Sequence, residues 1–524
     1  MTGSVVFLIL FLIIAAAVTY IVISTKQAKK NSKETFVMKL WKKDSIKSIA
    51  SSVISIICGL FIGVIILLLL AGKKIGESTI SYKAAFDGVQ LIFMGIFNTG
   101  RNASGQLTFG WNGTNIGDML FKAMPLILTG LSVAVSFKTG LFNIGAPGQY
   151  LVSSATTLIL ALAIPTEVVP AFFVWIIAFI GGILAGALWG AIPGAFKAFL
   201  NVNEVITCIM LNWIAANVVT SLFDKVTGPF KFLLDPSSTK NNAYVYKTIE
   251  NGIATPKLGL DKLFNGSQVN GGIIIAILIA VVVFIILNKT TFGYELKACG
   301  FNKNASKYAG INEKRNIILS MAIAGGLAGA GAALYYLSGN TEFRWETYQS
   351  LPAIGFNGIP VALLALNNPI GVIFSSIFMA YLDVSGLQIK IMTPYNEHLT
   401  SIIVSIIVYF SAFSLVIRQL LNGKNKKSFK KKKKETIVEE SVNTSNINTI
   451  ESDIQEVELQ AEEQPIIQEN KIINVEQSVT QEENVGNDLL EDLSDETVKK
   501  KSFLHRRSRK LFNKNSNRSS KVNK

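Results

Sequence analysis

The sequence is dominated by apolar runs long enough to cross a membrane. Runs of about 18 to 25 apolar residues span a hydrocarbon core about 30 Å thick, and few polar residues separate them here. Half of the 524 residues are hydrophobic and only 16% are charged. We therefore expect an all-α polytopic transmembrane bundle of about ten to eleven helices. The expected spans are residues 4–24, 49–71, 118–137, 140–163, 168–190, 203–223, 271–288, 316–338, 351–366, 369–389 and 399–420.

Two of these runs are irregular, and one has a competing interpretation. The run 351–366 is short and begins next to Pro352, which is typical of a half-helix or a re-entrant segment. The run 140–163 starts with glycine, proline and amides, so its helical part is uncertain in extent. The first run ends near three alanines, as a signal peptide can, but no basic residue precedes it. We expect an uncleaved helix.

Lysines in short loops indicate the orientation, because basic residues are retained on the cytoplasmic side. Eight lysines lie between the first two spans, and the connection 289–315 is also basic. This pattern places the N-terminus outside, the connections 72–117 and 224–270 outside, and the C-terminus in the cytoplasm. The expected location is the plasma membrane.

Composition divides the chain into three parts. Residues 1–48 hold the extra first helix and a basic loop, and residues 49–422 hold the remaining spans. Residues 423–524 form a charged tail, which is acidic from 435 to 497 and basic on both sides of that stretch. We expect the tail to be disordered and cytoplasmic, with its basic blocks against anionic lipid rather than nucleic acid. Binding to a partner or to nucleic acid is the alternative.

The sequence lacks the residue patterns that several kinds of functional site require. The three cysteines and two histidines are too widely spaced for a metal site, and no phosphate-binding GxxxxGK[ST] loop is present. The spans contain almost no ionisable residues away from their ends, which argues against a proton relay. We therefore expect a non-catalytic chain without a metal or cofactor. If ATP drives its activity, a partner chain binds the ATP and Mg²⁺.

Amide side chains are the strongest candidates for contact with a solute. The segment 142–149 reads FNIGAPGQ, and its Asn143 and Gln149 accompany backbone that glycine and proline make irregular. Irregular backbone at membrane depth is found where protein buries it or a cavity hydrates it. A plain turn between two helices explains the segment equally well. Asn212 and Asn217 lie within one span, and we expect them to share a face that contacts another helix or a cavity.

The basic connection contains a short amphipathic segment at 291–312. Asn302 is suited to cap a short helix that ends at Gly310, with aromatic and small side chains along one side and lysines beside them. A helix of two turns needs a docking surface to be stable, and a partner's groove would supply one. A surface loop on lipid headgroups is the alternative. The residues of the expected contact are Phe301, Lys303, Ala305, Lys307, Tyr308 and Gly310.

Glycine and alanine recur at a spacing of four in 181–190 and in 325–331. Such faces let helix backbones approach closely in a membrane. We expect them to pack helices together, and such helices could also slide against each other.

Four blocks of the sequence, in this order, resemble the permease subunits of ABC importers for nucleosides, which are related to ribose-type sugar permeases. The blocks are MPLILTGLSVAVSFKTGLFNIGAPGQ, NEVITCIMLNWIA, FGYELKACGFNKNASKYAGIN and GFNGIPVALLALNNPIG. The resemblance covers about residues 40–422. It departs from the family at Pro147, where relatives often carry an acidic residue, and in the helix 4–24 and the tail, which exceed the family's usual extent.

The resemblance implies a division of labour between chains. A second permease subunit, identical or different, would complete a dimer, an ABC ATPase would bind ATP in the cytoplasm, and an extracytoplasmic binding lipoprotein would deliver a nucleoside. Residues 291–312 would then supply the coupling helix that rests on the ATPase. A simple-sugar permease remains the first alternative. An ion-coupled carrier using Thr207 and the backbone near Gly145, and a membrane scaffold organised by the tail, are the others.

Overall fold

The computed structural model describes residues 44–395 apart from 73, 76–77, 80, 225, 235–243, 247–252 and 347, together with residues 402, 405–406 and 409–410. The chain divides into two units, Met1–Lys424 and Asn425–Lys524. The second unit, which contains the expected tail, lies outside the described residues, and so does the expected span 4–24.

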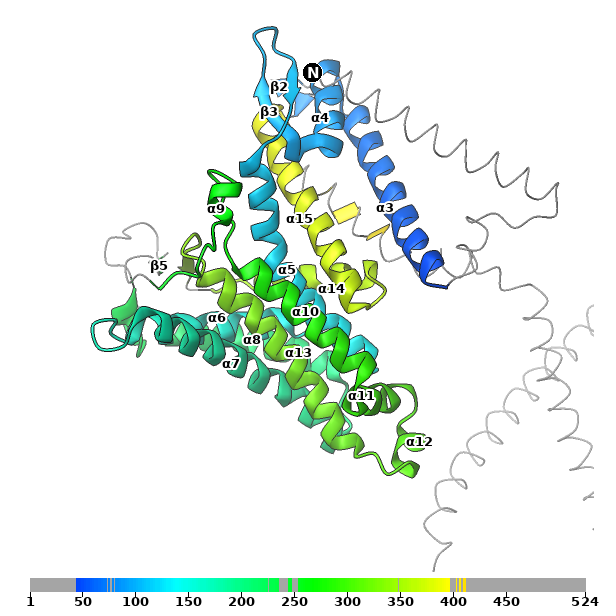
Figure 1. Ribbon diagram of the computed structural model, residues 1–524, viewed down its shortest axis with the longest axis vertical. Helices are drawn as coiled ribbons and strands as arrows, with labels where there is room; N and C mark the ends of the chain where they lie inside the picture. The colour runs from blue at the N-terminus through cyan, green and yellow to red at the C-terminus, as the bar shows by residue number, and fades with distance from the viewer. Residues whose placement is uncertain are drawn as a thin grey trace, which may run out of the picture. The chain divides into compact units, whose positions relative to one another are not determined.

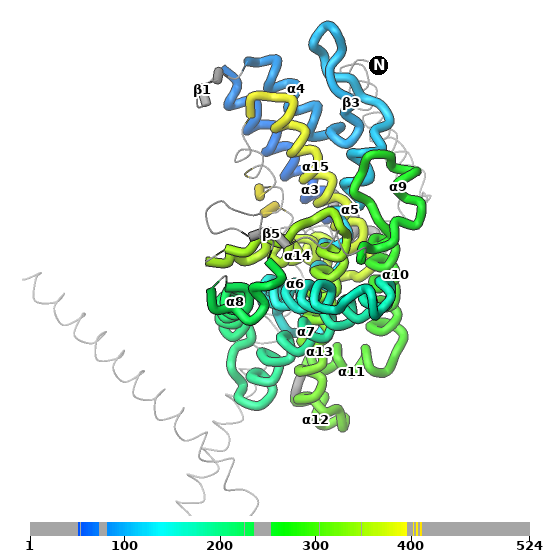
Figure 2. Tube along the Cα trace, turned by 90° about the vertical axis from the view of Figure 1, so that its left-hand side faces the viewer, coloured from blue at the N-terminus to red at the C-terminus, as the bar shows by residue number. Residues whose placement is uncertain are grey.

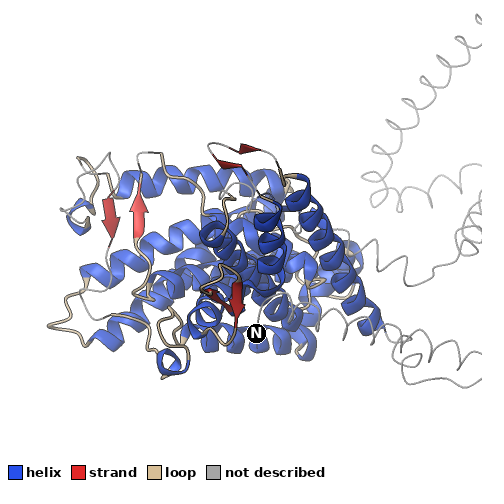
Figure 3. Ribbon diagram, turned by 90° about the horizontal axis from the view of Figure 1, so that it is seen from above, coloured by secondary structure: helices blue, strands red, loops and turns tan. Residues whose placement is uncertain are grey.

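Helices make up most of the described chain, and three short antiparallel strand pairs accompany them (Figure 3). The elements in chain order, labelled as in Figure 1, are α3 Asp44–Leu69, β1 Lys74–Ile75, β2 Ser78–Thr79, α4 Tyr82–Met94, η1 Gly95–Phe97, β3 Asn98–Arg101, β4 Leu107–Phe109, α5 Gly113–Lys138, α6 Ala146–Ala163, α7 Ala171–Leu200, α8 Glu204–Leu222, η2 Lys231–Leu233, β5 Tyr244–Tyr246, α9 Leu260–Leu263, α10 Gly272–Lys289, α11 Thr291–Phe301, α12 Lys303–Tyr308, α13 Glu313–Tyr336, β6 Phe343–Trp345, α14 Ala353–Leu364 and α15 Pro369–Met392.

Six described helices are long and apolar enough to cross a membrane, namely α5, α7, α8, α10, α13 and α15. Shorter apolar stretches lie in α3 and α14. Each expected span between 49 and 389 corresponds to one helix, so the prediction of a polytopic helical bundle is confirmed for the described part. The expected span 399–420 lies almost wholly outside it.

Helix α14 has the half-helix character that its sequence predicted. It begins after Pro352 and has 12 residues, which is about 18 Å of helix and less than a hydrocarbon core. Its glycines lie directly on neighbouring backbone. A Cβ atom built on Gly355 would lie 2.5 Å from the Cα of Pro147, and one on Gly358 would lie 2.6 Å from the carbonyl oxygen of Thr129. Helix α14 therefore packs against α5 and the start of α6.

Helix α5 is the centre of the largest hydrophobic cluster. Most of its side chains from Met119 to Ser136 are buried, and it packs against α10, α13, α14 and α15. Figure 1 shows α5 running through the middle of the bundle, with α11 and α12 at one end and α4 and β3 at the other. At the second of these ends, Gln388 joins Asn98 and Asn115 through buried amide hydrogen bonds of 2.8 and 3.1 Å. No pattern in the sequence indicated that these three amide side chains would meet.

The most extensive helix pair, α7 with α13, is held together by glycine faces. The carbonyl oxygen of Gly186 occupies the space that a Cβ atom on Gly325 would need, and the carbonyl oxygen of Gly182 lies 2.6 Å from the Cβ position of Gly329. Backbone therefore meets backbone along this interface. The packing role predicted for the two glycine-rich segments is confirmed.

Two adjacent glycines provide a matched test of this packing. Gly325→Ala forces a methyl group into the Gly186 carbonyl, and we expect it to lower the free energy of unfolding by about 1–3 kcal/mol, the usual cost of overpacking. Gly326→Ala meets its nearest atoms at 3.5 Å, an ordinary contact, so it is the control. Thermal unfolding of the purified protein in detergent compares the two. Equal stability of both variants would contradict the backbone contact.

Candidate functional site

The segment FNIGAPGQ forms a sharp turn that connects α5 to α6. Helix α5 ends at Lys138, and Gly140 follows with a positive φ of 74°, a conformation that favours glycine. Helix α6 begins at Ala146 with Pro147 in its first turn, where the missing proline N–H is not needed. The structure therefore supports the interpretation of this segment as a turn, and it places amide side chains inside that turn.

Asn143 and Gln149 pair with each other through two hydrogen bonds. The Asn143 Nδ2 donates to the Gln149 Oε1 at 2.7 Å, and the Gln149 Nε2 donates to the Asn143 Oδ1 at 3.0 Å. Asn143 also donates to the Ser132 hydroxyl at 3.0 Å and accepts from the Gly145 N–H at 3.1 Å. Both side chains are almost fully buried. The serine partner on α5 was not identified from the sequence, because a serine inside an apolar helix carries no distinctive signal.

Asn212 fastens the start of α6 to α8. Its Oδ1 accepts from the Gly148 N–H at 2.9 Å, and its Nδ2 donates to the Ile144 carbonyl at 3.0 Å. Gly148 lies in the first turn of α6, where N–H groups lack partners within the helix, so a side chain from another helix satisfies one of them. Asn143, Gln149 and Asn212 thus form one buried group, which we name the amide cluster.

Asn217 does not join the amide cluster. It is exposed on α8, whereas Asn212 is buried against α6. The expectation that the two share a face was wrong, because five residues rotate an α-helix by about 140° beyond a full turn. The Asn217 side chain donates to the Trp213 carbonyl at 2.9 Å.

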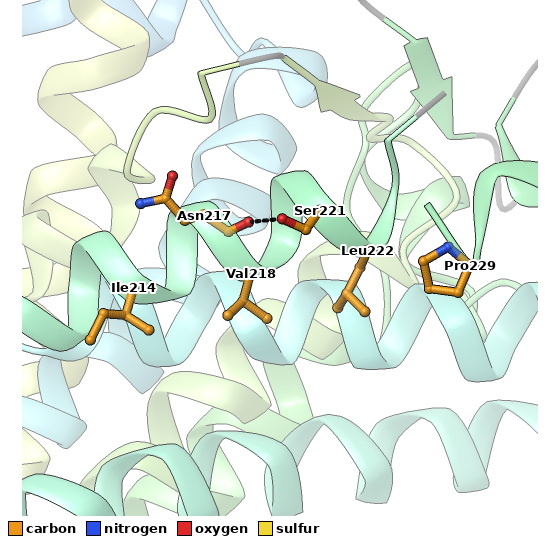
Figure 4. Close-up of a pocket in the computed structure, with 6 residues that line it drawn as sticks. All are labelled: Ile214, Asn217, Val218, Ser221, Leu222 and Pro229. Carbon is orange, nitrogen blue, oxygen red and sulfur yellow. Dashed lines mark hydrogen bonds between the residues drawn. The ribbon is translucent and has the colours of Figure 1, made fainter. Parts of the chain in front are cut away.

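Asn217 instead lines an open pocket of about 410 Å³ on α8 (Figure 4). The other lining residues are Ile214, Val218, Ser221, Leu222 and Pro229. Figure 4 shows the Ser221 hydroxyl donating to the Asn217 carbonyl oxygen, a bond of 2.9 Å. The pocket is mostly apolar. Just beyond α8, backbone N–H groups, chiefly that of Thr227, hold the pKa of the Asp224 carboxyl below its usual range.

The segment 291–312 forms two helices at one end of the bundle (Figure 1). The Asn302 Oδ1 accepts from the Ala305 N–H at 3.1 Å, which confirms the predicted N-cap of α12. Phe301, however, is the last residue of α11 and precedes that cap, so Phe301 and Tyr308 are not on one continuous helix as the spacing suggested. Their side chains are 89% and 94% exposed. Ala305, Lys307 and Gly310 are also exposed.

A backbone contact joins α11 to the turn before α6. A Cβ atom built on Gly140 would lie 2.5 Å from the Cα of Gly300, and one on Gly300 would lie 2.6 Å from the Gly140 nitrogen. Beside this contact, the hydroxyls of Thr139 and Ser320 are hydrogen-bonded. The exposed segment therefore contacts, through Gly300, the same turn that holds Asn143 of the amide cluster.

Two ion pairs join charged side chains near the ends of the spans. Lys122 bonds Asp383 at 2.7 Å between α5 and α15, and Lys197 bonds Glu204 at 3.0 Å between α7 and α8. Within the part of the chain that the structure describes, no group of three or more His, Cys, Asp or Glu side chains is placed to hold a metal ion. Among the described residues, the buried carboxylate of Asp87 on α4 pairs with Arg101 at 2.7 Å, and the other buried polar side chains are amides and hydroxyls.

These features define a multi-pass helical membrane protein whose buried polar side chains, in the described part, are mainly amides and hydroxyls, with an exposed two-helix segment at one end. Residues 115–412 match the model of a family described as the permease component of branched-chain amino acid transport systems. The chain belongs to this family. The expected membership among ABC importer permeases is thereby confirmed.

Three relatives illustrate the range of named substrates. The guanosine ABC transporter permease NupP of Bacillus subtilis is 35% identical, over 60% of this chain and 87% of its own. The nucleoside ABC transporter permease NupB of Lactococcus lactis is 37% identical, over 59% and 81%. The glucose ABC transporter permease TsgB13 of Haloferax volcanii is 28% identical, over 56% and 74%.

A double-mutant cycle tests whether the amide cluster holds the turn. Asn143→Leu leaves the Gln149 amide without its two hydrogen bonds, and Gln149→Met removes the same two bonds from Asn143, which keeps those to Ser132 and Gly145. We expect each variant to cost about 1–3 kcal/mol of unfolding free energy. The double variant should cost less than the sum, because the pair then disappears together. Thermal unfolding in detergent gives all three values. Additive costs would rule out the coupling, and Asn217→Leu serves as an exposed amide control.

Proposed function

We propose that the chain is a permease subunit of an ATP-driven importer for nucleosides. The observation that carries this proposal is the identity of 35–37% to permeases named for guanosine and nucleosides, over more than four-fifths of their length. The predominance of amides and hydroxyls among the buried polar side chains supports it, because these groups suit a solute that offers hydrogen bonds but no charge.

Energy would come from a partner ABC ATPase that docks on α11 and α12. The support is physical: Phe301 and Tyr308 are large aromatic side chains left in solvent, and aromatic side chains are enriched at the centres of protein interfaces. The contact between Gly300 and Gly140 would carry movement of this segment to the amide cluster. The lysines of this connection favour a cytoplasmic location for α11 and α12.

The remaining partners follow from the same proposal. An extracytoplasmic binding lipoprotein would deliver the nucleoside, and a second permease subunit would complete the membrane part. Asn217 lies on the exposed side of α8, where its amide faces away from the subunit's own core. We assign Asn217 to the solute pathway at that surface. Asn143 and Asn212 would act indirectly, by holding the start of α6, where Gln149 lies.

A sugar permease is the second candidate. The relative named for glucose supports it, although at 28% identity it is more distant than the two named for nucleosides. Amides and hydroxyls can bind a pentose as well as the ribose of a nucleoside, so the residues of the bundle do not separate the two.

Competition for uptake separates the two candidates. In vesicles that contain the chain with its ATPase, its second permease subunit and its binding protein, we expect labelled nucleoside uptake that unlabelled nucleosides suppress and free pentoses do not. The same vesicles without ATP provide the background. Uptake of labelled pentose without uptake of labelled nucleoside would favour the sugar permease instead.

Removal of an exposed aromatic side chain tests the docking surface. We expect Phe301→Ala and Tyr308→Ala each to weaken ATPase association about tenfold or more, the loss typical of an aromatic side chain central to an interface. Tyr348→Ala is the control, because Tyr348 is 92% exposed but lies outside α11 and α12. Co-purification of the ATPase with each variant gives the comparison. Normal association in both aromatic variants would overturn the assignment.

A further inference from the structure

Helix α6 carries a stripe of buried polar side chains along one side. The stripe begins at Gln149 in the amide cluster and continues through Tyr150, Ser153 and Thr157, all of which are at most 1% exposed. Their positions span about 100° of the helix surface, so they form one face. We name these four residues the α6 stripe. Helix α6 contacts α5, α7, α8, α13 and α14, which surround it in the bundle (Figure 2).

Three hydroxyls of the α6 stripe have no hydrogen-bond partner among the described residues. They belong to Tyr150, Ser153 and Thr157. A buried polar group without a partner costs about 1–3 kcal/mol, and native structures contain few of them. Three on one face of one helix therefore require an explanation.

Neighbouring residues show that the helix itself offers partners. The Ser154 hydroxyl donates to the Tyr150 carbonyl at 2.8 Å, and the Thr156 hydroxyl donates to the Val152 carbonyl at 3.0 Å. Ser153 and Thr157 do not use the equivalent carbonyls. Their hydroxyls lie over the glycine faces of α7 and α13 instead.

The glycines of α7 lie opposite the α6 stripe in antiparallel register. The Cβ position of Gly190 is 3.2 Å from the Gln149 Nε2, and that of Gly186 is 2.6 Å from the Ser153 Oγ. The Thr157 Oγ1 fills the Cβ position of Gly182. Gly329 of α13 also faces Ser153, with its Cβ position 2.6 Å from the Oγ. At these positions, glycine backbone rather than a side chain lies against the Ser153 and Thr157 hydroxyls, and no space separates α6 from α7 there in this conformation.

We propose that the α6 stripe is a binding surface for an uncharged, hydroxyl-rich solute, which reaches it when α7 moves away from α6. This proposal rests on the proposed function, because an alternating-access permease needs a pathway that is closed in some states. Hydroxyls that both donate and accept match the ribose part of a nucleoside. The stripe carries no ionisable acid or base at neutral pH, so it favours a neutral solute over an ion.

Paired substitutions on the same helix test the proposal in the assembled importer. The stripe variant is Ser153→Ala with Thr157→Val, and the control variant is Ser154→Ala with Thr156→Val, which removes hydroxyls that are already bonded. For the stripe variant we expect the KM for nucleoside uptake to rise about tenfold with an unchanged maximal rate, because two solute contacts are lost. Its thermal stability should equal or exceed that of the wild type, since two unpaired hydroxyls are removed. The control variant should keep the wild-type KM.

Two results would overturn the proposal. One is a wild-type KM in the stripe variant, and the other is a loss of thermal stability that accounts for its loss of uptake, which would assign the hydroxyls to packing. Failure of the proposed function is distinguishable, because wild-type vesicles would then take up pentoses and not nucleosides. In that event the same two variants, assayed with the pentose, judge the stripe independently.

Discussion

Close approach of helix backbones at glycine is the interaction on which the described bundle depends. In a hydrocarbon solvent, apolar side chains gain little by leaving lipid for protein, so close packing has to hold helices together. The contact of Gly186 with Gly325 brings α7 and α13 to backbone distance and encloses α6 beside them. The same approach leaves no room for side chains that could bond the polar face of α6. The glycine packing of α7 and α13 therefore also leaves the Ser153 and Thr157 hydroxyls of α6 without hydrogen-bond partners among the described residues.

The second constraint is that polar groups removed from water must find partners within the protein. The turn between α5 and α6 exposes N–H and carbonyl groups at bundle depth, and the amides of Asn143 and Asn212 satisfy several of them. This explains why amides occur in a segment that is otherwise apolar. Two roles can therefore be distinguished. The amide cluster holds the shape of the turn, whereas buried hydroxyls without a hydrogen-bond partner remain available to a solute.

The sequence predicted features that depend on neighbouring residues better than features that depend on tertiary contacts. Hydrophobic length located every described span, and capping chemistry located the start of α12 at Asn302, because both depend on neighbouring residues. Spacing failed where it needed the direction of a side chain: Asn217 faces away from Asn212, and the chain bends between Phe301 and Tyr308. The free hydroxyl of Ser153 could not be predicted, since it depends on glycines that lie 30 or more residues away in sequence.

The contact between Gly140 and Gly300 has a mechanical consequence. Side chains can accommodate small displacements by changing rotamer, but Gly140 and Gly300 have no side chain and their backbones are already in contact. The joint is therefore stiff. A displacement of α11 toward this contact therefore has to be accommodated by the backbone of the loop that leads into α6. A methyl group at either position would force the two backbones apart.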